Sequence, residues 1–219
     1  MYNETSNMEH LEQFLQIDGN THYRFDSYVN LIRWNSYWHQ IVETTTLMPE
    51  KVLIVGVGDN IVGKILKDLG ISVYTLDFDK ETSPDFVGNI TNIDNILQGE
   101  RFDVILCCQV LEHLPYNEVE NVLNKLRLIA DSVIISLPYC AANLKIDIKL
   151  PLLKNLRINI EFHRFFEKHK FDGQHYWEVG KKGFSKRKIT NDIKKYFVIK
   201  KRFTAVYNQY HLFFVLKSK

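Results

Sequence analysis

The sequence predicts a single α/β domain with a mostly parallel sheet and helices on both of its faces. The chain has 219 residues, of which 45% are hydrophobic and 25% charged, the size and composition of one globular domain. Strand-like and helix-like segments alternate over residues 51–138, as expected for a doubly wound parallel sheet. Two strand-like runs joined through Asn208 and Gln209 then close the chain. They predict a C-terminal antiparallel pair.

Residues 1–48 precede this alternation and are rich in aromatic side chains. Apolar residues between Tyr28 and Val42 recur at helical spacing, and Pro49 then ends the pattern. We therefore expect an N-terminal helical extension over residues 1–48, packed on a domain of residues 49–219. The extension serves either as a lid over a pocket or as a subunit contact, and the sequence leaves both open.

The elements of the domain follow from short β-branched runs and from their punctuation. Gly70 has the position of a residue just past a helix end, and Pro138 closes a strand. The expected strands are 52–56, 72–77, 102–108, 131–138, 196–207 and 210–217, and the expected helices are 60–70, 117–130 and 185–196. Residues 140–180 break the alternation with clustered His, Phe and Lys, which indicates an insertion.

Composition excludes several classes of protein. The N-terminus lacks a basic start followed by an apolar stretch, and no apolar run is long enough to span a membrane. Three cysteines, two of them adjacent, suit reduced core thiols. We expect a cytoplasmic protein with no membrane partner. The net charge is +2, but lysines crowd the last quarter, as a solvated helix face or as an anion-binding face.

A glycine turn and an acid indicate a nucleoside site. Gly56 and Gly58 follow the first strand, where glycine lets a ligand lie against backbone at the start of a helix. Asp77 ends the second strand, where a carboxylate accepts hydrogen bonds from both ribose hydroxyls. A dinucleotide fingerprint requires a third glycine at position 61, where this chain has Ile61, so the spacing disfavours NAD.

With this turn and the segment from Gln109 to Pro115 (QVLEHLP), the chain resembles the class I S-adenosylmethionine-dependent methyltransferases, particularly their small-molecule group. The resemblance spans about residues 50–138. It implies a Rossmann-like, mostly parallel seven-stranded sheet with a C-terminal antiparallel strand pair. It also implies S-adenosylmethionine as the cofactor.

The resemblance assigns roles to the residues of the turn and of the second strand end. Gly56, Gly58 and Asp59 would cradle the methionine part of the cofactor. Asp77 would hold the ribose, and Phe78 would flank the adenine.

The resemblance also covers later positions, with two departures. Asn89 and Ile90 stand where the family places an acidic residue against the adenine amino group, and Gln109 would cap the strand beneath the cofactor. The family commonly has an acid where this chain has Ile54 and a third glycine where it has Asn60. Asn tolerates positive φ better than most residues, so the turn is expected to form.

Catalysis would be a direct displacement at the sulfonium methyl, and a hydroxyl acceptor also needs a base. His113 and His175 are the candidate bases, the second lying in the insertion over the pocket. The six-residue spacing of His163, His169 and His175 matches no compact zinc pattern, so no metal is expected. Glu112 alone does not establish a cation site.

The sequence therefore predicts methyl transfer from S-adenosylmethionine to a small-molecule or carbohydrate-linked acceptor. Transfer to oxygen is favoured over transfer to nitrogen because histidine bases are available. Relatives that the chain resembles often look like members of bacterial surface-polysaccharide pathways, and this resemblance implies a sugar-like acceptor. Two alternatives stay open. One is a nucleic-acid methyltransferase that uses the basic C-terminal region. The other is an inactive S-adenosylmethionine-binding protein, motivated by Ile54 and Asn60. The oligomeric state is not indicated.

Overall fold

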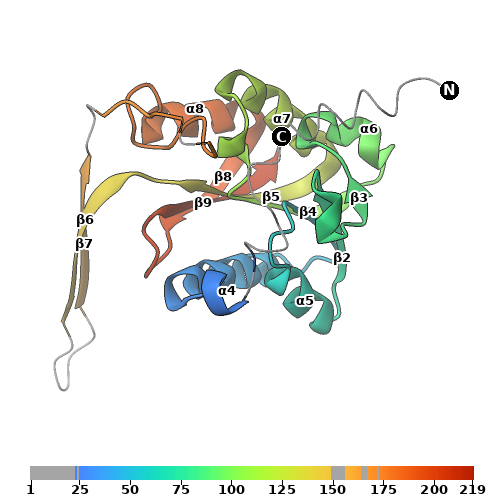
Figure 1. The fold of residues 1–219 in the computed structure, drawn as a ribbon, viewed down its shortest axis with the longest axis horizontal. Helices are drawn as coiled ribbons and strands as arrows, with labels where there is room; N and C mark the ends of the chain where they lie inside the picture. The colour runs from blue at the N-terminus through green and yellow to red at the C-terminus, as the bar shows by residue number, and fades with distance from the viewer. Residues whose placement is uncertain (1–22, 24, 149–155, 164–166, 172) are drawn as a thin grey trace.

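The structure, a computed structural model, describes residue 23 and residues 25–148, 156–163, 167–171 and 173–219 (Figure 1). Its centre is a seven-stranded sheet with the order β3-β2-β1-β4-β5-β9-β8. The strands are β1 Lys51–Val55, β2 Ser72–Asp77, β3 Phe86–Val87, β4 Phe102–Cys108, β5 Ala130–Pro138, β8 Phe197–Thr204 and β9 His211–Ser218. Strands β1 to β5 are parallel, whereas β9 runs antiparallel to both β5 and β8. The predicted fold, including its C-terminal antiparallel pair, is confirmed.

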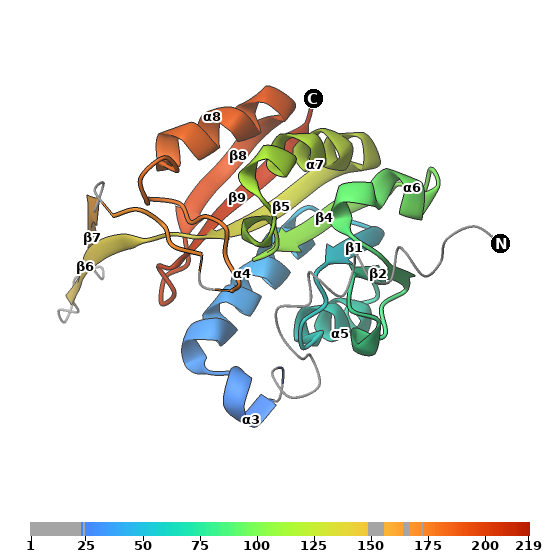
Figure 2. The ribbon, with the colours of Figure 1, turned by 45° about the horizontal axis from the view of Figure 1, so that its top comes forward.

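Strand β1 shows why the sheet is covered on both faces. Val52 and Ile54 belong to one buried apolar cluster, and Leu53 and Val55 belong to the other. Successive side chains of a strand point to opposite faces, so a continuous apolar run requires a layer on each side. Figures 1 and 2 show these layers, with α4 and α5 on one face and α6, α7 and α8 on the other.

The helices are α3 Phe25–Tyr28, α4 Leu31–Thr46, α5 Ile61–Asp68, α6 Ile93–Leu97, α7 Tyr116–Ile129 and α8 Lys186–Tyr196. Three short 3-10 helices lie at strand ends: η1 Lys80–Thr82, η2 Ile90–Asn92 and η3 Leu111–His113. Gly70 follows the last turn of α5 with φ of +85°, in the left-handed conformation expected of a residue past a helix end.

Helix α4 lies where the N-terminal apolar spacing predicts a helix. The side chain of Asn30 caps its first turn by accepting a hydrogen bond of 2.9 Å from the amide of Arg33. Residues 1–22 of the expected extension lie outside the described residues. The division of the chain at residue 48 stays a prediction.

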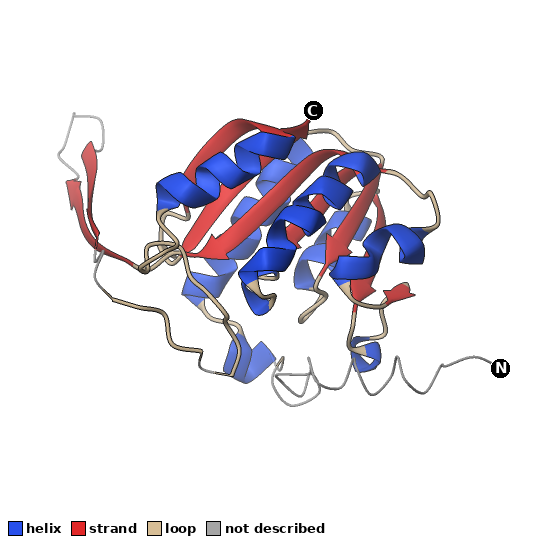
Figure 3. Ribbon diagram, turned by 90° about the horizontal axis from the view of Figure 1, so that it is seen from above, coloured by secondary structure: helices blue, strands red, loops and turns tan. Residues whose placement is uncertain are grey.

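The insertion contains a hairpin that the sequence analysis did not anticipate. Strands β6 Ala141–Ile148 and β7 Leu156–His163 pair antiparallel and form a separate two-stranded sheet. Figures 1 and 3 show this hairpin projecting from the body. Its exposed apolar side chains are Leu144, Ile146, Ile148, Ile158, Ile160 and Phe162. Within the described ranges, no helix combines the length and apolar character needed to cross a membrane.

Candidate functional site

A pocket opens at the carboxyl ends of β1, β2 and β4, on the edge of the sheet where parallel α/β folds bind ligands. The strand order reverses between β1 and β4, which leaves a crevice between the loops that follow them. The lining residues are Tyr23, Tyr28, Val55, Gly56, Gly58, Leu76, Asp77, Phe78, Asp79, Thr82, Gly88, Asn89, Ile90, Cys108, Gln109, Val110, His113 and Leu114.

The glycine turn forms one wall of the pocket. Gly56 has φ of +80°, and a Cβ there would lie 2.7 Å from Cγ2 of Val110, so only glycine fits. Asn60 adopts φ of +56°, which shows that the turn forms without a third glycine. The Cβ of any residue replacing Gly63 would meet Oδ1 of Asn60 at 2.1 Å. Glycine at position 63 therefore makes room for the side chain of Asn60.

Asp77 faces this turn from the end of β2. The amide of Val57 donates to its Oδ2 at 2.7 Å, and the amide of Asp79 donates to its Oδ1 at 3.0 Å. The side chain is only 8% exposed, and burial raises the pKa of this carboxyl. Each carboxylate oxygen has a further lone pair, so Asp77 is able to accept hydrogen bonds from a diol in the pocket.

Phe78 lines the pocket beside Asp77, but Asp59 does not belong to the lining. The carboxylate of Asp59 instead accepts hydrogen bonds from the hydroxyl of Tyr37 and, at 3.1 Å, from the amide of Ile61. Asp59 thus ties α4 to the start of α5, and its contact with the cofactor stays a prediction. Ile54, which stands where an acid is common, is 7% exposed and packs in the core.

Asn89 and Ile90 line the far end of the pocket, after β3. The Oδ1 atom of Asn89 accepts hydrogen bonds of 3.0 Å from both the amide and the hydroxyl of Thr91, and so caps η2. Its acceptor oxygen is thereby used within the protein. The other polar group of this side chain is an amide nitrogen, which only donates.

Gln109 and Cys108 form the floor of the pocket at the end of β4. Gln109 has φ of +57°, a conformation that costs energy for a residue with a Cβ and that often accompanies a functional site. Its backbone amide donates to the carbonyl of Ser136, and its Nε2 donates to Oγ of Ser136 at 3.2 Å. Burial raises the pKa of the Cys108 thiol to about 12, so this sulfur stays protonated.

The N-terminal extension contributes two residues that the sequence analysis did not assign to the site. Tyr23 and Tyr28 line the pocket, and their rings contact edge to face with centroids 4.9 Å apart. The guanidinium of Arg33 lies 3.6 Å from the centre of the Tyr28 ring. Cε1 of Tyr23 is 3.7 Å from the position that a Cβ on Gly58 would take. Tyr23 therefore lies against the glycine turn, and Tyr28 packs beside Tyr23.

The two candidate bases come together although they are distant in the sequence. The rings of His113 on η3 and His175 in the insertion meet edge to face with centroids 5.1 Å apart. Nδ1 of His113 lies 3.0 Å from the carbonyl oxygen of Gln174, and Nδ1 of His175 lies 3.1 Å from Oε1 of Glu178. Because a carbonyl and a carboxylate only accept, both Nδ1 atoms carry the proton.

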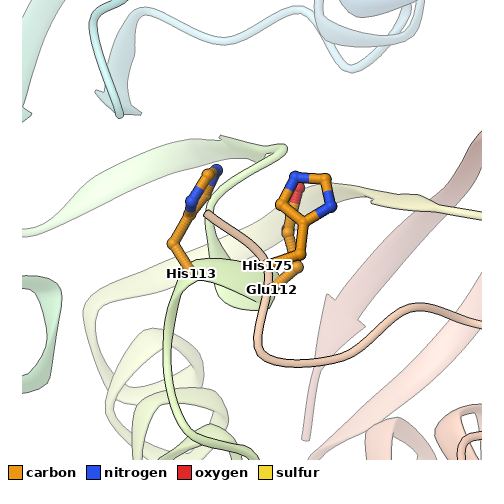
Figure 4. A group of neighbouring side chains, drawn as sticks. All are labelled: Glu112, His113 and His175. Carbon is orange, nitrogen blue, oxygen red and sulfur yellow. The ribbon is translucent and has the colours of Figure 1, made fainter. Parts of the chain in front are cut away.

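Glu112 lies beside these histidines and is completely buried. Figure 4 shows its carboxyl group next to the ring of His175, with His113 on the other side of the cluster. Burial raises the pKa of Glu112 to about 8. Neither carboxyl oxygen has a hydrogen-bond partner in the part of the chain that the structure describes.

The segment that carries His175 is anchored to η3 and to the loop after it. The indole of Trp177, which is fully buried, donates to the carbonyl of Leu114 at 3.1 Å, and the amide of Tyr176 donates to the carbonyl of Glu112. The histidine is thereby held over the end of β4. The side chain of His163 and the whole of Asp172, which the sequence places in the same cluster, lie outside the described residues.

The sheet order defines a Rossmann-like α/β protein with a pocket at the carboxyl ends of its parallel strands. No protein-family model matches the sequence, and no curated protein matches it. Several solved structures with a similar fold are methyltransferases. The N-methyltransferase NodS from Bradyrhizobium japonicum, in complex with S-adenosyl-L-homocysteine, is 10% identical, with a TM-score of 0.58 over 96% of this chain and 97% of that one.

Two further neighbours have the same fold. The glycopeptide N-methyltransferase MtfA, complexed with S-adenosyl-L-homocysteine, is 10% identical with a TM-score of 0.56, over 97% of this chain and 99% of that chain. An S-adenosylmethionine-dependent methyltransferase from Clostridium acetobutylicum is 11% identical with a TM-score of 0.54, over 87% and 92% of the two chains. This chain thus has the fold of class I methyltransferases.

Proposed function

We propose that the protein transfers a methyl group from S-adenosylmethionine to an oxygen of a small-molecule or sugar-like acceptor. The observation that carries this proposal is Asp77, which lines the pocket while its carboxylate is bonded to the amide of Val57 in the glycine turn. A carboxylate that can accept hydrogen bonds from the two hydroxyls of a ribose thus lies beside a glycine backbone against which a ligand can pack. A nucleoside joined to an amino acid needs both.

The proposed cofactor lies along the ends of three strands. Its methionine part contacts the turn at Gly56 and Gly58, and its ribose hydroxyls donate to Asp77. Its adenine lies between Phe78 and Ile90. All five residues line the same pocket. Gln109 lies beneath the cofactor. Because the Cys108 thiol stays protonated, it does not compete as a thiolate nucleophile for the sulfonium methyl.

The proposed reaction is a displacement in line with the sulfonium sulfur. An acceptor oxygen attacks the methyl carbon, the carbon–sulfur bond breaks with its electrons going to sulfur, and S-adenosylhomocysteine leaves. The hydroxyl proton passes to a base, for which we propose His175 or His113. His113 lines the pocket, and both rings carry their proton on Nδ1, which makes Nε2 the basic nitrogen.

We propose that residues 49–219 form the methyltransferase domain, that residues 1–48 extend it, and that the insertion at about 140–180 binds the acceptor. The insertion supplies His175 to the site. The extension supplies Tyr23 and Tyr28, which supports its role as a lid.

The basic C-terminal region gives less support to a nucleic-acid acceptor. Several of its lysines are paired with acids of the same protein, among them Lys186 with Glu161 and Lys188 with Asp192. Paired charges release fewer counterions on binding a phosphate backbone.

A second candidate is transfer to nitrogen. Two structural neighbours are described as N-methyltransferases. An amine that arrives protonated also needs a base before it can attack, so the same histidines would serve.

The test of the proposed function has two stages. Calorimetric titration with S-adenosylmethionine and S-adenosylhomocysteine should show binding at micromolar concentrations. Isotopically labelled methyl transfer to panels of hydroxyl-bearing sugars, amines and RNA then identifies the acceptor. Absence of binding by either nucleoside would refute the proposed function, and binding without transfer to any panel would favour the inactive cofactor-binding protein.

A further inference from the structure

Glu112, His113 and His175 form a cluster with the composition of a metal site. One potential ligand atom from each residue lies within 4.8 Å of those of the other two. The first two residues are neighbours on η3, and the third comes from the insertion (Figure 4). Because His175 is distant in sequence from the other two residues, no local spacing pattern predicts the cluster.

The buried carboxyl group of Glu112 is the strongest argument for a bound ion. It is 0% exposed, and both of its carboxyl oxygens lack a hydrogen-bond partner among the described residues. Burying a carboxylate without a partner costs several kcal/mol on the order-of-magnitude scale for isolated charges. A bound cation would compensate that charge and satisfy an oxygen. Acidic groups with this burial are therefore uncommon unless paired or ligating.

The two histidines have the supporting contacts that metal ligands require. A ligating imidazole donates its other N–H to a carbonyl or a carboxylate, which fixes its tautomer and orientation. Nδ1 of His113 contacts the carbonyl of Gln174, and Nδ1 of His175 contacts the carboxylate of Glu178. Glu178 is held in turn by the hydroxyl of Tyr210 at 2.5 Å. In this tautomer the lone pair of each ring is on Nε2.

We propose that Glu112, His113 and His175 bind one divalent transition-metal ion, such as zinc or manganese, at the acceptor side of the pocket. Two imidazoles and one carboxylate suit borderline and harder divalent ions. Ligands bonded to such an ion at about 2.0–2.2 Å lie about 3–3.5 Å apart, so the cluster contracts by side-chain rotation on binding. Three protein ligands leave coordination positions open for a further group.

This site deepens the proposed function and, in its chemical role, rests on it. His113 lines the pocket, so an oxygen of the acceptor is able to reach an open coordination position. Coordination lowers the pKa of a hydroxyl, whose proton then passes to water. With both Nε2 atoms bound to the ion, the metal takes over the role that a histidine base has in the metal-free reaction. The expected acceptor is therefore a hydroxyl compound that coordinates a cation, and a simple amine is not.

The test is direct metal binding by full-length protein without an affinity tag. Stripped protein is titrated calorimetrically with zinc chloride and with manganese chloride, and bound metal is counted after gel filtration. We expect one equivalent per chain. Glu112→Gln and His175→Gln should weaken binding by at least 10-fold. Glu178→Gln, which alters only a supporting contact, should weaken it by about 10-fold, less than either ligand substitution.

His39→Gln is the matched control, because His39 packs against Phe203 away from the cluster and its loss should leave the stoichiometry unchanged. Unchanged melting temperatures of the stripped variants show that they fold. Added metal should raise the melting temperature of the wild type but not of Glu112→Gln.

Failure to bind either ion, or equal binding by the wild type and Glu112→Gln, would overturn the inference. Titration of the same samples with S-adenosylhomocysteine separates it from the proposed function. Nucleoside binding without metal binding refutes only the metal site, whereas metal binding without nucleoside binding refutes only the proposed cofactor.

Discussion

The carboxylate of Asp77 accepts a hydrogen bond of 2.7 Å from the backbone amide of Val57, which joins the end of β2 to the glycine turn after β1. The residue proposed to bind the ribose therefore also holds the loop proposed to bind the methionine part. A single side chain couples the two halves of the pocket.

Asp77→Ala should weaken S-adenosylhomocysteine binding by about 1.5–3 kcal/mol, as the loss of charge-assisted hydrogen bonds predicts. Calorimetric titration measures this. Asp94→Ala is the control, because Asp94 forms an exposed ion pair with Lys125 outside the pocket and its loss should leave affinity unchanged. Equal affinities of the wild type and Asp77→Ala would contradict the assignment of Asp77.

Comparing Gly56→Ala with Gly70→Ala separates the effect of a strained backbone, which both substitutions cause, from that of a steric clash, which only the first causes. The two glycines have φ of +80° and +85°, so alanine costs about 1–2 kcal/mol at either position. Only at position 56 does the new Cβ meet another atom, Cγ2 of Val110 at 2.7 Å. Gly56→Ala should therefore lose more stability in urea unfolding and should also lose nucleoside affinity. A similar loss of affinity in Gly70→Ala would show that the effect is not local to the pocket.

The central fold was predictable because its information is local. A run such as Val52–Val55 specifies a strand buried on both faces, and Gly70 and Pro138 mark the element ends. The hairpin was missed even though its sequence contains a signal. Leu144, Ile146 and Ile148 alternate with polar residues in β6, the period of two that a strand requires. This alternation is short, and the clustered His, Phe and Lys of residues 140–180 break the pattern of the flanking elements.

The candidate site divides in the same way. The glycine turn, Asp77 and Gln109 stand at strand ends, so their positions follow from the order of the elements. Tyr23 enters the pocket from the extension and His175 reaches Glu112 from the insertion, through packing that no local pattern encodes. Asp59 shows that a motif position does not fix where a side chain bonds, because its carboxylate accepts a hydrogen bond from the amide of Ile61 at the helix start.

Asn89→Asp should tighten S-adenosylhomocysteine binding by about 0.5–1.5 kcal/mol. One carboxylate oxygen would keep the cap on Thr91, and the other would accept from the adenine amino group in place of the amide nitrogen. Calorimetric titration of the wild type and Asn89→Asp measures this. Asn89→Ala is the comparison, since it loses the cap and gains no acceptor. Weaker binding by Asn89→Asp than by the wild type would place the adenine elsewhere.

His211 should make the protein unstable in mild acid. It is 8% exposed, and its Nδ1 has no hydrogen-bond partner among the residues that the structure describes. Burial, with a smaller effect of the charge on Arg33, lowers its pKa to about 3 from 6.5. The neutral ring is therefore favoured in the folded state, and its contribution to stability is complete above about pH 6.5 and is lost as the pH falls toward 3.

Urea unfolding at pH 7, 6 and 5 should show the wild type losing stability relative to His211→Leu by up to about 1.4 kcal/mol for each pH unit below 6.5. His39→Leu is the comparison with a shallower slope, because Glu43 opposes the effect of burial there. A difference between the wild type and His211→Leu that stays constant from pH 7 to 5 would show that the folded protein accommodates a protonated His211.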